Sequence, residues 1–261
     1  MYTPVRGTTT LLRRTAIASN TNLRTYFETK RRYHIWKRTF DLGFSIFAIV
    51  FIFSWLFPLI ALLIKLDSRG PVFFIQRRVG FLGRTFKCLK FRTMVVNKEA
   101  NWRMATKNDP RITRIGILLR KSNLDELPQF FNVLLGQMSI VGPRPHMHKD
   151  CCDFSRVVPF YKFRNFAKPG ITGLAQSKGF RGPAKDFLSI FHRYQWDAFY
   201  VRNANFWLDI RLVRKTATQT IYYVWLKSKE TFRNLWKQSD RIHKVRIAYR
   251  EMLSNLNGIM F

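Results

Sequence analysis

The stretch LGFSIFAIVFIFSWLFPLIALLI, Leu42–Ile64, decides the architecture, because none of its residues carries a charge. As one straight helix it would extend roughly 34 Å, enough for a hydrocarbon core of about 30 Å. It begins too late and is too long for a cleavable signal peptide, and no small-residue cleavage site follows it. The stretch therefore predicts a membrane helix.

The flanks of this stretch indicate how the helix lies in the membrane. Lysine and arginine mark the cytoplasmic ends of membrane helices, yet here they occur at both ends: Arg31, Arg32, Lys37 and Arg38 before the stretch, and Lys65, Arg69, Arg77 and Arg78 after it. Pro58 also removes the backbone donor for the Ser54 carbonyl, which favours a bend. A re-entrant helix that enters and leaves on the cytoplasmic face satisfies both observations, and a straight transmembrane helix is the alternative.

The composition is strongly basic. The 261 residues include 46 lysines and arginines against 15 acidic residues, a formal net charge of +31. Such an excess implies an anionic partner, which could be nucleic acid, an acidic membrane surface or a phosphorylated substrate. A hydrophobic content of 47% excludes intrinsic disorder. The spacing of Cys88, Cys151 and Cys152 fits neither a disulfide framework nor a zinc site, which indicates a reducing compartment.

Asp125 and Glu126 are the only acids between Asp109 and Asp150, in a stretch rich in arginine and lysine. Two adjacent carboxylates in such surroundings suggest a Mg²⁺ site or phosphoryl chemistry, because hard cations take carboxylate and phosphate oxygens and a carboxylate can attack phosphorus. The alternative is structural. Acids in the first turn of a helix favour its dipole, and Asn123 with Glu126 has capping-box spacing.

Basic side chains that could bind phosphate occur in two places. Lys90 and Arg92 would share one face of a strand, with a solvated strand face as the alternative. Arg144 lies between two prolines, which suits a guanidinium that presents a fork to a phosphate, although the same residues also make ordinary surface turns. His146 and His148 fit a solvated loop better than a metal site.

Short strands and helices are expected after the membrane stretch. The residue patterns predict strands at 72–76 and 85–94, helices at 111–121 and from 123–127 to 136, a glycine-rich basic loop region at 168–183, and one helix over 187–212. Neither a Walker loop nor a Rossmann glycine pattern is present in the sequence.

Read together, six stretches closely resemble the bacterial sugar transferases, the monotopic polyprenyl-phosphate phosphoglycosyl transferases that start exopolysaccharide and related glycan assembly. The stretches are Lys90–Met94, Asp109–Thr113, Leu124–Gln129, Phe131–Leu134, Met138–Pro145 and Lys168–Gly173. The resemblance runs from about Arg38 to Leu212. It is strongest to the undecaprenyl-phosphate glucose or galactose phosphotransferases.

The resemblance implies transfer of hexose 1-phosphate from a UDP-sugar to undecaprenyl phosphate, with release of UMP. Asp125 matches the family nucleophile, which forms a covalent phosphosugar intermediate, and Glu126 matches its partner in Mg²⁺ binding. Lys90, Arg92 and Arg144 match basic positions that bind phosphates. The implied location is the bacterial inner membrane with the catalytic domain on its cytoplasmic face. No nucleic acid partner is expected, and association into a homo-oligomer is left open.

The expected fold is α+β and membrane-monotopic, a re-entrant helix joined to a small mixed cytoplasmic catalytic domain with interfacial amphipathic helices. Its four parts are a basic tail at 1–33, the re-entrant helix at 34–66, the catalytic domain at 67–212 and a basic amphipathic extension at 213–261. Tail and extension are expected to lie on anionic membrane lipid. A leader without function is the alternative for the tail, and a core-packing helix is the alternative for the extension.

One departure from the family concerns Leu174, where members usually have tryptophan, in a loop that we expect to face the substrate. This departure and the basic extension motivate a rival hypothesis, a catalytically inactive membrane anchor or scaffold of a glycan assembly complex. The charge alone motivates another, a nucleic-acid-binding protein, but the sequence contains no recognisable binding motif.

Overall fold

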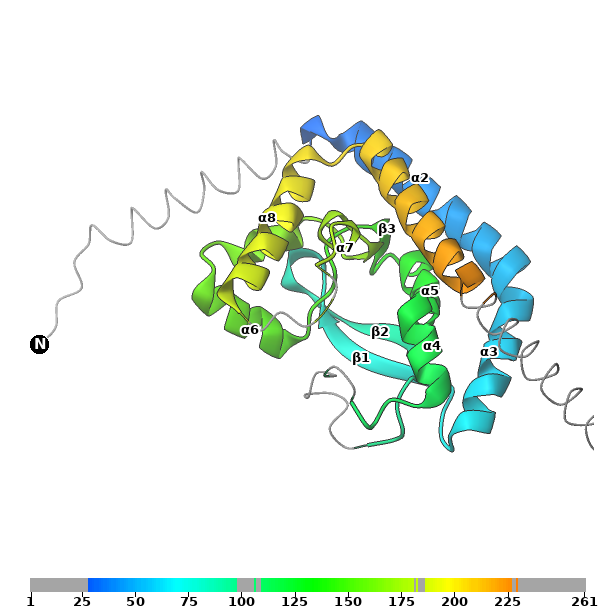
Figure 1. The fold of residues 1–261 in the computed structure, drawn as a ribbon. Coiled ribbons are helices and arrows are strands. Elements are labelled where there is room, and N and C mark those ends of the chain that lie inside the picture. Colours follow the sequence, from blue (N-terminus) through cyan, green and yellow to red (C-terminus); the bar gives the residue numbers. More distant parts are fainter. Residues whose placement is uncertain are drawn as a thin grey trace, which may run out of the picture.

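The computed structural model describes residues 28–97, 106, 109–180, 182, 186–226 and 229. Most of the predicted tail, and the predicted extension beyond residue 226 except residue 229, therefore lie outside the described residues. The described part contains both helices and strands (Figure 1), which confirms the mixed fold class.

The apolar stretch lies in one helical segment, Arg31–Asp67, that is long and apolar enough to cross a membrane. The segment consists of α2, Arg31–Phe47, a π-helical part, Ala48–Phe53, and α3, Ser54–Asp67. Only 17% of its most apolar 18-residue window is buried inside the protein. Most of this apolar surface is therefore not covered by the described residues.

The membrane segment is bent. Figure 1 shows that the chain changes direction between α2 and α3. The π-helical part lies at this change and Pro58 follows within α3, and both features interrupt the ordinary hydrogen-bond ladder of an α-helix. The sequence predicts the bend from Pro58 alone, whereas the structure adds a π-helix upstream of it.

Two buried carboxylates fasten the membrane segment to the rest of the protein. Asp41, in α2, accepts a hydrogen bond from the backbone N–H of Ile140 at 3.0 Å. On the same helix, Lys37 Nζ and the Tyr33 hydroxyl donate to Asp209 Oδ2 at 2.7 and 2.9 Å. Because each carboxylate is buried with its partners, these contacts specify one orientation of the helix on the domain.

Within the described residues, the strands form two pairs. β1, Phe73–Val79, and β2, Thr85–Phe91, make an antiparallel hairpin close to the predicted strands. β3, Ser139–Val141, and β4, Gly170–Thr172, pair in parallel. The prediction of a loop at the position of β4 is wrong, because a three-residue strand is too short to show an alternating pattern.

Glycines allow β3 and β4 to lie close together. A Cβ on Gly142 would collide with the Lys168 carbonyl oxygen, and one on Gly170 would collide with the backbone nitrogen of Gly142. The glycines of these two stretches therefore serve close backbone packing rather than loop flexibility.

Helices surround the strands in Figure 1. They are α4, Arg114–Ser122, a 3-10 turn at Leu124–Glu126, α5, Gln129–Leu134, α6, His148–Val157, a 3-10 helix at Tyr161–Phe166, α7, Leu174–Ser177, α8, Phe187–Asn203, and a helix at 206–226.

The prediction of a single helix over 187–212 is wrong, because residues 204 and 205 are not helical and separate two helices. There the Asn205 side chain accepts a hydrogen bond from the Leu208 N–H at 3.0 Å and caps a new helix. The predicted boundary after residue 212 lies inside this new helix.

The main core joins the membrane segment to the domain. It contains Phe53 from the π-helical part, Phe130 from α5 and Tyr200 from α8. Leu174 belongs to the same core and is only 8% exposed. Packing therefore explains the apolar side chain of Leu174, while the expectation that its loop faces the substrate stays a prediction.

Candidate functional site

The two adjacent acids lie in the connection between α4 and α5. Asn123 ends α4 with a left-handed backbone, φ 59°, and its side chain does not cap the following 3-10 turn. The predicted capping box is therefore wrong, and Asp125 and Glu126 are not first-turn residues of an α-helix. The turn instead holds both carboxylates beside the end of β2 and the loop after β3.

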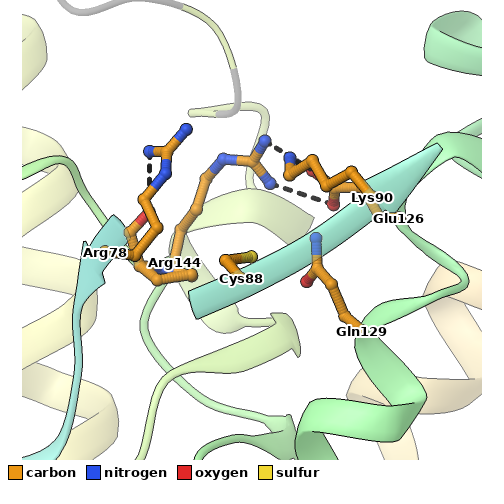
Figure 2. A pocket seen from close by; sticks show the side chains of 7 residues that line it. Arg78, Cys88, Lys90, Glu126, Gln129 and Arg144 are labelled. Carbon is orange, nitrogen blue, oxygen red and sulfur yellow. Dashed lines mark hydrogen bonds and ion pairs between the residues drawn. The ribbon is translucent and has the colours of Figure 1, made fainter. Parts of the chain in front are cut away.

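Glu126 is held by two cations from separate parts of the fold (Figure 2). Lys90, in β2, donates to Oε1 at 2.6 Å. Arg144, in the turn between two prolines, donates to Oε1 at 2.7 Å and to Oε2 at 3.1 Å. The fork geometry predicted for Arg144 is thus present, with a carboxylate of the protein as its partner.

Asp125 is in a different state from its neighbour. Asp125 as a whole is only 9% exposed, yet its carboxylate accepts no hydrogen bond from the residues that the structure describes. Burial and, after it, the charge of Glu126 raise the pKa of Asp125 to about 6, against the opposing effect of Lys90. Burial also opposes ionisation of Glu126, but Arg144 and Lys90 outweigh it and lower the pKa of that carboxyl.

The two carboxylates therefore differ in both hydrogen bonding and pKa. Glu126 is a fixed anion between cations, whereas Asp125 is an unengaged carboxylate with raised basicity. Paired acids whose surroundings separate their pKa values are typical of catalytic sites.

Arg92 has a different position from the one its spacing suggests. β2 ends at Phe91, and the Arg92 guanidinium donates to the backbone carbonyls of Arg69 at 2.7 Å and Ser68 at 2.8 Å. These carbonyls directly follow α3. The structure therefore brings Lys90, Glu126 and Arg144 together and places Arg92 at the end of the membrane segment.

Sequence reasoning missed several residues of the site. A small pocket beside Glu126 is lined by Lys90, Arg144 and four further residues: Arg78, Cys88, Gln129 and Pro145 (Figure 2). Arg120, in α4, adds a positive charge near Asp125 and donates to the Thr93 hydroxyl at 2.7 Å. Gln129 is the last residue of Leu124–Gln129, one of the stretches that resemble the bacterial sugar transferases, so the sequence could have indicated it as a site residue. Arg78 was read only as a flanking charge.

His146 is not in a solvated loop, and that prediction is wrong. It is 4% exposed, and its Nδ1 lies 2.6 Å from the Tyr161 hydroxyl and 3.2 Å from an Arg164 nitrogen. Burial, followed by the charges of Arg164 and Arg193, holds the pKa of His146 well below its usual range. It is a neutral core residue under the turn that carries Arg144.

Known proteins are similar in sequence to this chain over most of its length. The family model described as bacterial sugar transferase matches residues 32–223, beyond the predicted stretch of resemblance at both ends. The UDP-glucose:undecaprenyl-phosphate glucose-1-phosphate transferase of Xanthomonas campestris pv. campestris is 49% identical over 164 residues, which is 62% of this chain and 34% of that protein.

Two further relatives differ in length. The UDP-N-acetylgalactosamine-undecaprenyl-phosphate N-acetylgalactosaminephosphotransferase of Aeromonas hydrophila is 44% identical over 69% of this chain and 42% of that protein. The exopolysaccharide production protein PSS of Rhizobium leguminosarum bv. phaseoli is 43% identical over 71% of this chain and 94% of that protein. The chain thus spans less than half of some relatives and nearly all of another. With the family match and the paired acids in one turn, the chain belongs to the bacterial sugar transferase family.

Proposed function

We propose that this protein transfers hexose 1-phosphate from a UDP-sugar to undecaprenyl phosphate, forming undecaprenyl-diphosphate-sugar and UMP. Relatives named for this reaction support the proposal. The observation that carries it is the contrast within the acid pair, a buried Asp125 carboxylate without a hydrogen-bond donor beside a Glu126 held by two cations. A covalent phosphoryl transfer needs this division, one carboxylate to attack and cations to stabilise the phosphate.

The reaction proceeds by two displacements at one phosphorus. In the first, an oxygen of Asp125 attacks the phosphorus that bears the sugar, and the bond to the UMP oxygen breaks with its electron pair leaving on UMP. In the second, an oxygen of undecaprenyl phosphate attacks the same phosphorus and releases Asp125. Lys90 and Arg144 lie where they can neutralise the phosphate oxygens in both steps.

The acid pair fits Mg²⁺. The described residues contain no group of three or more His, Cys, Asp or Glu side chains that could hold a metal. Mg²⁺ is commonly bound by one or two carboxylates together with phosphate oxygens, and Asp125 and Glu126 provide such a pair. When bound, the ion supplies charge neutralisation on the diphosphate. A diphosphate that attracts Lys90 and Arg144 would free the oxygens of Glu126 for this use.

The bend of the membrane segment supports a monotopic position in the bacterial inner membrane, with the catalytic part on the cytoplasmic face. Exposed apolar side chains follow the bent segment, among them Phe51 and Trp55, and others lie on the helix at 206–226, among them Trp207 and Trp225. Tryptophan is enriched where protein meets the membrane interface, and the basic residues fit anionic lipid.

Labelling of introduced cysteines should place both ends of the membrane segment on one side. Thr29→Cys and Arg69→Cys, each made with Cys152→Ser to remove an exposed native thiol, should react with an impermeant maleimide only from the cytoplasmic side. The unmodified Cys152 of the parent protein marks the side of the catalytic part. Labelling of Thr29→Cys and Arg69→Cys from opposite sides would establish a spanning helix.

The activity itself is tested by UMP release from membranes that contain the protein, over a panel of UDP-sugars, with and without undecaprenyl phosphate and Mg²⁺. We expect release that needs both, and the donor that supports it identifies the sugar. An inactive scaffold would release no UMP from any donor.

A further inference from the structure

The pocket beside Glu126 is lined by the side-chain amide of Gln129, to which the proposed roles of Asp125 and Glu126 assign no function. Gln129 is the first residue of α5 and is only 2% exposed. Figure 2 shows its side chain pointing into the pocket, toward the side where Arg144 meets Glu126. No described residue forms a hydrogen bond with this amide. Because buried polar groups nearly always have a partner, an unpartnered amide aimed into a pocket points to a ligand.

Arg78, across the pocket, is a second such group. Its guanidinium donates to the Pro145 carbonyl at 3.1 Å and to the Gln76 side chain, and its Nε is buried without a hydrogen-bond partner. Within the described part of the chain it forms no ion pair with a carboxylate, unlike Lys90 and Arg144. A half-buried cation without an anion is unfavourable, so the place beside Arg78 suits a negatively charged ligand.

The pocket as a whole selects for a phosphate. Three cations, Arg78, Lys90 and Arg144, line it against one acid, Glu126. In Figure 2 the charged groups of all three lie on the same side of β2, and Cys88 lies below them. This excess of positive charge, with an amide that can donate, matches the oxygens of a phosphate group.

We propose that Gln129 and Arg78 form a subsite that binds the phosphate of the leaving UMP. The identity of the ligand rests on the proposed function. In an in-line displacement the nucleophile and the leaving group lie on opposite sides of the transferred phosphorus. Glu126 lines the pocket and Asp125 does not, so the pocket lies next to the nucleophile without containing it, a place where a leaving group can bind. The phosphate of the lipid substrate is the other source of the same chemistry.

Binding and kinetics of Gln129→Met test this subsite, because methionine keeps the volume of glutamine and removes its amide. We expect UDP, measured by calorimetry on the full chain in detergent, to bind roughly tenfold more weakly. The KM for the UDP-sugar should rise while the KM for undecaprenyl phosphate stays unchanged. Gln195→Met, on α8 and outside this pocket, is the matched control and should behave as the parent protein.

Two further variants keep the test decisive if Gln129→Met folds poorly. Gln129→Glu is nearly isosteric and should weaken UDP binding more than methionine does, because it places a negative charge beside the phosphate. Arg78→Lys keeps the charge, loses the fork, and should also weaken UDP binding.

Each outcome decides between the hypotheses. Unchanged UDP affinity in Gln129→Met and Gln129→Glu would overturn the subsite. A raised KM for undecaprenyl phosphate alone would overturn the assignment to the leaving group and place the lipid phosphate there. UDP binding does not require turnover. If the variants lost UDP binding while the parent protein released no UMP from any donor, the subsite would stand and the proposed function would fail.

Discussion

Replacement of Asp125 by asparagine should reduce UMP release on the order of 10⁴-fold or more, the scale seen when a covalent nucleophile is removed. The amide of asparagine does not attack phosphorus. Glu126 is not expected to take over the role, because its oxygens accept hydrogen bonds from Lys90 and Arg144 and, once a diphosphate attracts these cations, are expected to bind Mg²⁺. The loss should appear in kcat for every UDP-sugar that the parent protein accepts.

The same substitution should leave the fold intact. Because burial raises the pKa of Asp125, its ionised form is disfavoured in the folded protein, and a neutral asparagine removes that cost. We therefore expect Asp125→Asn to remain in the membrane fraction with a melting temperature no lower than that of the parent protein. Asp153→Asn, which changes an exposed acid on α6, is the matched control and should retain full activity. Full activity of Asp125→Asn would rule out the covalent mechanism.

Features set by local residue patterns could be predicted from the sequence. The membrane stretch is long and uncharged, and the β1–β2 hairpin follows from two short runs of strand-forming residues on either side of a turn with Gly80 and Gly83. The acid pair stands out because Asp125 and Glu126 are isolated acids in a basic stretch. In each case the deciding information lies in one continuous stretch of the sequence.

Features that depend on contacts between distant residues could not be predicted. The burial of Leu174 depends on packing in the main core, which no local pattern reveals. His146 was assigned to a loop because its partners Tyr161 and Arg164 follow it by many positions. β4 forms only because Gly170 can approach Gly142 closely. The break before the helix at 206–226 rests on one capping residue, Asn205, in an otherwise helical pattern.

In the candidate site too, local patterns could be predicted and contacts between distant residues could not. The spacing of Lys90 and Arg92 suggests one shared face, but β2 ends between them and the two side chains reach different partners. Arg78 joins the pocket only through the folded hairpin, where it meets the turn that carries Arg144. A sequence pattern shows which chemical group a residue carries. Which other residues that group contacts depends on where the strand or helix ends.

Replacement of Glu126 by glutamine should lower both activity and stability, and the two effects can be separated. The change leaves Lys90 and Arg144 without their carboxylate in a largely buried site, and breaking one side of a buried ion pair typically costs about 3–5 kcal/mol. The melting temperature in detergent should therefore fall. UMP release should fall by at least about 100-fold, as expected when groups that stabilise the transferring charge lose their position.

The double variant Glu126→Gln with Lys90→Met distinguishes these causes. It removes one of the two unpaired cations, so part of the lost stability should return, while activity stays low because Lys90 no longer meets the phosphate. If activity returned together with stability, Glu126 would serve only to hold its cations. If Glu126→Gln alone kept full turnover at saturating Mg²⁺, neither a metal nor a positioning role would be needed. The expected pattern, a partial return of stability without activity, requires that Glu126 and Lys90 both serve the reaction, Glu126 through Mg²⁺ and Lys90 through the phosphate.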